Sequence, residues 1–273
     1  MSYASILVHV DANSASHSRL ACARAAAERF GATLIGLGAE MVPPMAAGPV
    51  AGPITAEYYT AMNETVEKGL VAAKAVFATT AAGLPKTPVW ETVHWFPGEA
   101  MAAAARSADL IVTGRAPKDH NMYRDASAAE LVLASGRPVL IAPSKAPPLA
   151  AKRVLFAWKD TREARRAMSD AMPFFEKAEA VLVFAATSDD EIDAKAATDD
   201  VVAALKRHGA AAEAKVEVRA DFHGADLIDR AARFGADLIV AGGYGHSRLG
   251  EWAFGGVTRD LLFQDDAYVV LSH

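Results

Sequence analysis

An internal repeat is the feature that most constrains how this chain can fold. The run ADLIVTG at 108–114 is almost identical to the run ADLIVAG at 236–242. Their aspartates, Asp109 and Asp237, are 128 residues apart in a chain of 273 residues. A period close to half the chain length predicts two tandem copies of one structural unit.

A proline-rich segment, PSKAPP at 143–148, lies between the copies and is typical of a linker. We predict a first unit at 1–143, a linker at 144–151 and a second unit at 152–273. With 52% hydrophobic and 22% charged residues, the chain can form two ordinary globular cores. Its single cysteine, Cys22, excludes an intrachain disulfide framework.

Short β-branched runs alternate with longer segments of helical period in both units. The predicted strands lie near 4–11, 32–40, 88–96, 108–114, 138–142, 152–158, 179–186, 214–221, 236–242 and 267–271. The predicted helices lie near 14–30, 56–82, 98–107, 126–135, 161–177, 197–209, 224–234 and 256–264. Strands that lack polar alternation are typical of sheets covered on both faces. We therefore predict an α/β protein of two tandem doubly wound units, each a five-stranded parallel sheet with helices on both faces.

The net charge of −5 is unevenly shared. Residues 1–145 contain 12 basic and 12 acidic side chains, whereas residues 146–273 contain 16 and 21. An acidic balance argues against nucleic-acid binding. The sequence has no apolar stretch of the roughly 20 residues that a membrane helix needs and no signal peptide. We expect a cytoplasmic protein that binds neither nucleic acid nor membranes.

Ligands of doubly wound sheets bind at the carboxyl ends of the strands. There, the strand at 236–242 is followed by a glycine-rich loop that leads into the helix predicted at 256–264. Glycines let backbone N–H groups approach an anion, and a helix start adds unpaired donors. The pattern favours a phosphate site, and a plain surface or interface loop is the alternative. Neither a P-loop motif nor the G-x-G-x-x-G motif of dinucleotide-binding folds is present.

The spacing of Gly242, Gly245 and Gly255 fits G-x2-G-x9-G, so the chain resembles the universal stress protein family in its tandem form. The resemblance covers essentially the whole chain. It implies a strand order of 3-2-1-4-5 in each unit and binding of ATP or AMP, with Mg possible beside ATP. It also implies an intrachain pseudo-dimer packed through the fifth strands, and a homodimer is a further possibility.

Three departures from the family pattern direct attention to the second unit. Gly256 replaces the expected Ser or Thr, so Thr258 is the candidate substitute. Lys159 replaces the acid expected after the unit's first strand, where it either contacts phosphate or is simply solvated, and Asp160 follows it. In the first unit the acid is present as Asp11, but the residues after Gly114 no longer form a glycine loop.

We therefore predict a nucleotide site in the second unit. Its candidate residues are Gly242, Gly245, Gly255, Gly256, Thr258, Lys159, Asp160, Arg248 and Arg259. Arg248 and Arg259 would clamp phosphate, or else form salt bridges with neighbouring acids. Asp11 and Gly114 are first-unit candidates, and for Asp11 a helix cap is an equal alternative.

Two functions remain open at the level of sequence. The first is a stress-response module that binds nucleotide, with no catalytic residues and at most slow ATP hydrolysis. The second is a scaffold or interaction protein of the same fold that binds no nucleotide. No motif for a metal site or a nucleophile elbow occurs, and His9 is interpreted as a hydrogen-bonded core residue.

Overall fold

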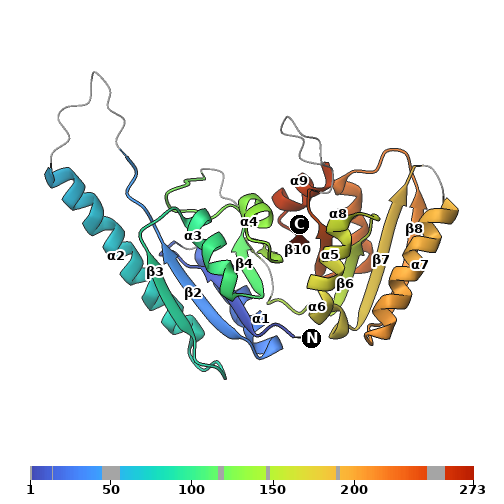
Figure 1. Ribbon diagram of the computed structural model, residues 1–273, viewed down its shortest axis with the longest axis horizontal. Helices are drawn as coiled ribbons and strands as arrows, with labels where there is room; N and C mark the ends of the chain where they lie inside the picture. Colours follow the sequence, from blue (N-terminus) through green and yellow to red (C-terminus); the bar gives the residue numbers. More distant parts are fainter. Residues whose placement is uncertain are drawn as a thin grey trace, which may run out of the picture.

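The computed structural model describes residues 2–13, 15–44, 56–115, 120–145, 148–188, 191–244 and 256–273. Within them, the strands form one ten-stranded sheet in the order β3-β2-β1-β4-β5-β10-β9-β6-β7-β8. The two halves of the chain lie side by side, with β3 and β8 at opposite ends of the sheet (Figure 1).

Each half follows the predicted alternation of strands and helices. The first half consists of β1 (Ser5–His9), α1 (Ala15–Phe30), β2 (Thr33–Ala39), α2 (Ala56–Ala81), β3 (Val89–Val93), α3 (Pro97–Ala104), a 3₁₀ turn (Ala105–Ser107), β4 (Leu110–Gly114), α4 (Ala128–Ala134) and β5 (Val139–Ala142). The second half consists of β6 (Arg153–Ala157), α5 (Arg162–Asp170), α6 (Met172–Glu176), β7 (Ala180–Thr187), α7 (Glu191–Arg207), β8 (Ala212–Val218), α8 (Gly224–Phe234), β9 (Leu238–Gly242), α9 (Gly256–Phe263) and β10 (Tyr268–Ser272).

The strand order confirms the predicted fold class. Neighbouring strands within each half pair in parallel, and in both halves they follow the order 3-2-1-4-5. Between the halves, β5 pairs with β10 in the antiparallel direction. The fifth strands thus satisfy each other's edges, and a homodimer would have to use another surface.

The repeated aspartates join the first and fourth strands of each half. Asp109 accepts hydrogen bonds from two successive backbone N–H groups at the start of β1, at 2.8 and 3.0 Å. Asp237 does the same at the start of β6, at 2.9 Å each. Carboxylates that accept backbone N–H groups make strong, charge-assisted bonds. The aspartate of the ADLIV run therefore has the same structural role in both copies.

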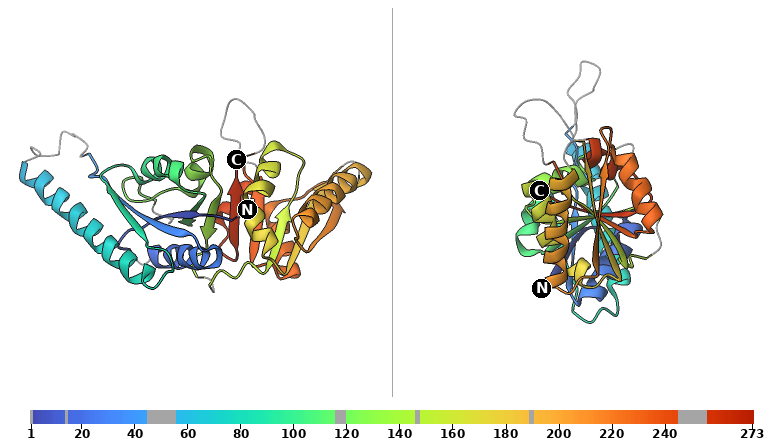
Figure 2. Two further views of the ribbon diagram at one scale, coloured as in Figure 1. Left: turned by 60° about the horizontal axis from the view of Figure 1, so that its bottom comes forward. Right: turned by 90° about the vertical axis from the view of Figure 1, so that its right-hand side faces the viewer.

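Helices cover both faces of the sheet, as the end-on view shows (Figure 2). One core cluster contains residues of α1, α2, α5, α6 and α7, and the other contains residues of α3, α4, α8 and α9. The central strands are buried between them, which explains why their sequences are apolar on both faces. No helix in the described part of the chain is long and apolar enough to cross a membrane.

Aromatic rings and two arginines join the halves. Tyr3 and Phe30 of the first half pack edge-on, and Phe30 meets Phe174 of α6 with ring centroids 4.9 Å apart. Arg29 donates hydrogen bonds to three backbone carbonyls at the start of the second half and at the end of α6. Arg115 donates to three carbonyls at the end of α9 and before β10.

The structure corrects two predicted helix boundaries. The helix predicted at 161–177 is divided at Ala171 into α5 and α6, because Pro173 lacks the N–H that a continuous helix needs. The helix predicted at 197–209 begins earlier, at Glu191. The predicted linker at 144–151 falls between β5 and β6, and we propose it as the boundary of the two units.

Candidate functional site

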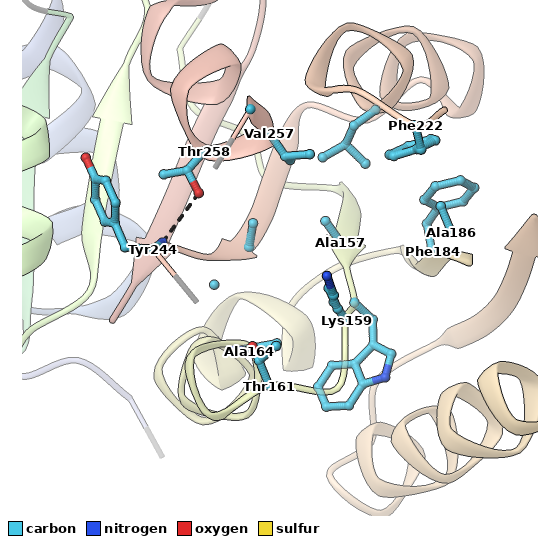
Figure 3. Close-up of a pocket in the computed structure, with 15 residues that line it drawn as sticks. Ala157, Lys159, Thr161, Ala164, Phe184, Ala186, Phe222, Tyr244, Val257 and Thr258 are labelled. Carbon is cyan, nitrogen blue, oxygen red and sulfur yellow. Dashed lines mark hydrogen bonds between the residues drawn. The ribbon is translucent and has the colours of Figure 1, made fainter. Parts of the chain in front are cut away.

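A cavity of about 340 Å³ lies at the carboxyl ends of β6, β7 and β9 (Figure 3). This is the edge at which doubly wound sheets bind ligands. Its walls come from the ends of the three strands and from the starts of α5, α8 and α9. The lining residues are Ala157, Trp158, Lys159, Thr161, Ala164, Phe184, Ala186, Phe222, Leu227, Ala241, Gly242, Tyr244, Gly256, Val257 and Thr258.

Three helix starts converge on the cavity because each of these helices follows a strand of the parallel sheet. Thr161 is the N-cap of α5, and its Oγ1 accepts a hydrogen bond from the backbone N–H of Ala164 at 3.3 Å. The backbone N–H of His223, before α8, donates to Asp226 at 2.9 Å. Helix starts present partial positive charge and unpaired N–H groups. The cavity is therefore suited to an anionic ligand.

Gly242 is a glycine for a steric reason. A Cβ atom there would lie 2.6 Å from the backbone nitrogen of Ala164 and 2.7 Å from the carbonyl carbon of Glu163. The absence of a side chain lets the end of β9 pack directly against the first turn of α5. Two residues later, Tyr244 has a left-handed backbone with φ of 59°. Such strain in a non-glycine residue is concentrated at functional sites.

Thr258 and Gly256 form the wall at the start of α9. Thr258 is 7% exposed, and its Oγ1 lies 3.4 Å from the backbone nitrogen of Tyr244, which donates to it (Figure 3). Among the described residues, none has an atom within 4 Å of a Cβ built at Gly256. The described residues therefore leave room for a side chain at this position.

The charge at the cavity differs from that of the whole unit. Among the described lining residues, Lys159 is the one with a formal charge. Its acidic neighbours are engaged elsewhere: Asp160 pairs with Arg165 at 2.7 Å, and Glu163 pairs with Arg162 at 3.0 Å. Burial alone would raise the pKa of Glu163, but its own backbone N–H and Arg162 hold it below its ordinary value. Among the described residues, the lining of the cavity thus contains no acidic side chain, although the unit as a whole is acidic.

The opposite part of the cavity is apolar and aromatic. The rings of Phe184 and Phe222 lie with centroids 5.5 Å apart and planes inclined by 35°. Ala186 lies beside these rings and away from Thr258 (Figure 3), and Leu227 also lines the cavity. A flat apolar group fits such a wall, whereas an anionic group fits the helix starts.

The structure brings together some of the predicted residues. Gly242, Lys159, Gly256 and Thr258 all line the cavity. The side chain of Asp160 is engaged with Arg165, and Arg259 is exposed on α9; neither is among the lining residues. The remaining candidates, Gly245, Gly255 and Arg248, lie outside the described residues.

In the first half, a buried polar cluster occupies the equivalent position. Val8 of β1 pairs with Val112, and Phe156 of β6 pairs with Val240, which is the same position of the repeated ADLIV run. The next residue, His9, therefore corresponds to the cavity-lining Ala157. Arg19 Nε donates to the carbonyl oxygen of His9 at 2.7 Å, and its Nη2 pairs with the carboxylate of Asp11. The Arg19 side chain also passes Gly114, where a Cβ would lie 3.8 Å from its Cδ.

The protonation states of this cluster follow from its burial. Burial first, and the charge of Arg19 second, lower the pKa of His9 to about 4. Its Nε2 lies 3.2 Å from the carbonyl oxygen of Ala39. For Asp11, burial alone would raise the pKa, but Arg19 holds it below the ordinary value. Both first-unit candidates, Asp11 and Gly114, thus lie against Arg19.

Sequence reasoning did not identify most of the lining side chains. Thr161 was recognisable as a helix cap, since a threonine precedes a helical segment after the first strand of the unit. Phe184 and Phe222 carry no local signal, because they meet only when β7 and the segment before α8 reach the same edge. Among the described residues, no group of three His, Cys, Asp or Glu side chains is placed to hold a metal ion.

No protein-family model matches the sequence. No curated protein matches it either. Among solved structures, a universal stress protein from Archaeoglobus fulgidus DSM 4304 covers 98% of this chain and 95% of its own, with a TM-score of 0.68 and 16% identity.

Two further solved structures are similar to all or part of this chain. A protein of unknown function from Pseudomonas aeruginosa PAO1 covers 99% of this chain and 92% of its own, with a TM-score of 0.60 and 15% identity. A universal stress protein from Archaeoglobus fulgidus in complex with dAMP covers 45% of this chain and 98% of its own, with a TM-score of 0.36 and 22% identity. The likeness to the DSM 4304 protein spans nearly the whole of both chains, so this chain has the fold of a universal stress protein, with two tandem units.

Proposed function

We propose that this chain is a universal stress protein that binds an adenine nucleotide, ATP or AMP, in the cavity of its second unit. The observation that carries the proposal is the convergence of the starts of α5 and α9 and of Lys159 on a cavity whose other wall, before and at the start of α8, is apolar and aromatic. Phosphate would lie at the start of α9, near Gly256 and Thr258. The base would lie against Phe184 and Phe222.

The size and polarity of the cavity support this assignment. Ligand sites typically measure about 300–1,000 Å³ and combine apolar walls with a few polar groups. The cavity, at about 340 Å³, lies at the lower end of that range and has this composition. Gly242 supports it further, since the close packing of β9 on α5 brings the cap of α5 beside the end of β9.

We propose that the site holds nucleotide with at most slow turnover. None of the described lining residues has a carboxylate or imidazole side chain that could orient a water molecule or bind magnesium. Magnesium bound with ATP would therefore be held mainly by the phosphates. In the first unit, the cluster of His9, Asp11 and Arg19 is proposed to be structural.

Calorimetric titration with AMP and ATP tests the proposal. The diagnostic variant is Thr258→Val, which removes a hydroxyl at the proposed phosphate end of the cavity and keeps nearly the same side-chain shape. The matched control is Thr113→Val, a buried threonine in β4 of the first unit. We expect saturable binding in the wild type and the control and at least fivefold weaker binding in Thr258→Val. Absence of saturable binding at millimolar nucleotide would refute the proposal.

One observation favours the scaffold alternative. Large apolar side chains are exposed around edge strand β3 and the start of α2, namely Tyr58, Tyr59, Val89, Val93 and Trp95. Exposed apolar patches and open edge strands are typical of interaction surfaces. Two results together would favour this function: no nucleotide binding by the wild type, and a complex of this protein that is lost in the variant Trp95→Ser.

A further inference from the structure

We infer that Tyr244 is a positioning residue of the proposed site, which orients the hydroxyl of Thr258 from the contact surface between the two halves of the chain. This inference rests on the proposed function and adds a residue to the phosphate end of the same cavity. Tyr244 lies two residues after the end of β9 and is among the lining residues. Its role follows from what its neighbours in the chain, its ring and its backbone N–H group contact.

The end of β9 passes between the cavity and the first half of the chain. A Cβ atom at Gly242 would lie 2.6 Å from the backbone nitrogen of Ala164, a residue that lines the cavity. A Cβ atom at Gly243 would instead lie 3.1 Å from Cγ1 of Val132, which belongs to α4 of the first half. The backbone N–H of Gly243 donates to the carbonyl oxygen of Ser272 at 2.8 Å. The chain is therefore packed on both sides before it reaches Tyr244, and the first half forms one of these sides.

The ring of Tyr244 continues this packing. It lies 6.4 Å from the ring of His273, measured between centroids, and packs against the core cluster to which Val132 belongs. Figure 3 shows the ring pointing away from Val257, towards the side on which the first half lies. The backbone of Tyr244 has φ of 59°, which a residue with a side chain keeps only when its surroundings hold it there. The packed ring supplies that hold.

The backbone of Tyr244 acts on Thr258 through one hydrogen bond. Its N–H donates to Oγ1 of Thr258, 3.4 Å away. A hydroxyl has one hydrogen to donate, and because its oxygen accepts this bond, that hydrogen points to a different partner. A phosphate oxygen at the start of α9 would be such a partner. Tyr244 and Thr258 also stand on either side of the glycine-rich segment 245–255 in the sequence, so the bond connects the residues that flank it.

The first half thereby influences a cavity whose described lining residues all belong to the second half. Without a ring at position 244, the chain after β9 would lose its anchor and sample other backbone conformations. The hydroxyl of Thr258 would then lose its fixed orientation. Because Tyr244 acts through that hydroxyl, removal of its ring should weaken nucleotide binding by no more than removal of the hydroxyl itself.

The test is a double-mutant cycle for AMP affinity, measured by calorimetric titration of the full chain. Tyr244→Gly removes the ring and adopts a left-handed backbone without strain, and Tyr244→Asn is a second variant without the ring that tolerates this backbone. Each is also combined with Thr258→Val, because the effects of independent residues add and those of coupled residues do not. The control is Tyr3→Gly, which removes a ring that joins the halves through Phe30 and Phe174, outside the lining of the cavity.

We expect Tyr244→Gly and Tyr244→Asn to bind AMP about three- to fivefold more weakly than the wild type, as for the loss of one hydrogen bond. Each double variant should bind AMP within about twofold of Thr258→Val alone. Tyr3→Gly should lower the urea midpoint of unfolding and keep the wild-type affinity for AMP within about twofold.

Wild-type affinity in both variants without the ring, or losses that add to that of Thr258→Val, would overturn the inference and leave the proposed function intact. An equal loss of AMP affinity in Tyr3→Gly would also overturn it, because the affinity would then depend on the contact between the halves in general. If the wild type does not bind AMP, the proposed function fails, and this inference fails with it.

Discussion

Arg115 offers the sharpest test of how the two units support each other. It follows β4 of the first unit, yet its guanidinium donates to the carbonyl oxygens of Leu261, Leu262 and Ala267 in the second, at 2.6, 3.1 and 3.0 Å. Two of these carbonyls belong to the last turn of α9, which has no intrahelical donors for them. The start of the same helix forms the phosphate end of the proposed site. The substitution Arg115→Met removes the donors and keeps much of the volume.

The expected loss follows from these contacts. Hydrogen bonds from a charged donor contribute about 1.5–3 kcal/mol each, so three contribute about 4.5–9 kcal/mol. Burial lowers the pKa of Arg115 from 12.5 to about 10, which means that the folded chain bears a desolvation cost of about 3 kcal/mol. The variant avoids that cost. We therefore expect the free energy of unfolding to fall by about 1.5–6 kcal/mol.

Urea unfolding measures this change, and hydrogen exchange localises it. The control is Arg137→Met, because Arg137 also bonds two carbonyls, at 3.2 and 3.4 Å, but only within the first unit. Because these two bonds are longer and one of them is exposed to solvent, we expect the control to lose less free energy of unfolding than Arg115→Met, about 1 kcal/mol. In Arg115→Met, amides of α9 should exchange faster, while those of β6 and β7 stay protected. Equal stability of the two variants, or unchanged exchange in α9, would refute the reasoning.

Three further predictions concern single residues. His9 has a pKa of about 4 in the folded chain against 6.5 when unfolded. Its contribution to the free energy of unfolding is therefore complete above pH 6.5 and is lost as the pH falls towards 4. In urea unfolding, the free energy of unfolding should fall by about 2–3 kcal/mol between pH 7 and pH 4.5, and by less in His9→Gln. An equal loss in both proteins would contradict this. Gly256→Ser should fold normally and bind AMP about fivefold more tightly by calorimetry, because no described residue occupies the space of the new side chain and its hydroxyl adds one hydrogen bond to phosphate; weaker binding would place the phosphate elsewhere. Gly242→Ala should instead lower the unfolding free energy by about 1–3 kcal/mol, because its Cβ would meet the backbone of Ala164, and an unchanged urea midpoint would show that the contact relaxes freely.

The candidate site was predictable in its location and in part of its composition. Gly242, Gly256, Thr258 and Lys159 were identified from their spacing after strands, and all four line the cavity. Asp160 is the next residue after Lys159, yet its side chain turns to Arg165 instead. One residue along a turn changes the direction of a side chain, and spacing alone does not determine which direction is taken.

The first unit shows a second limit of sequence reasoning. Asp11 has the residue type that the resemblance implies for a ribose contact, but it pairs with Arg19. Arg19 lies eight residues later on α1, and nothing in its local sequence predicts that it inserts between Asp11 and Gly114. The interpretation of His9 as a hydrogen-bonded core residue is confirmed by its 1% exposure and its contact with Ala39.

The sequence by itself determined the two-unit architecture, the strand and helix alternation and the edge at which a ligand would bind. Those features depend on periodicity and on the repeat of the ADLIV run, which are local properties of the chain. The tertiary structure decided which residues meet: the aromatic wall of Phe184 and Phe222, and the contacts of Arg115 with the end of α9. Each joins residues far apart in sequence, and their contacts exist only after the parallel strands align their carboxyl ends.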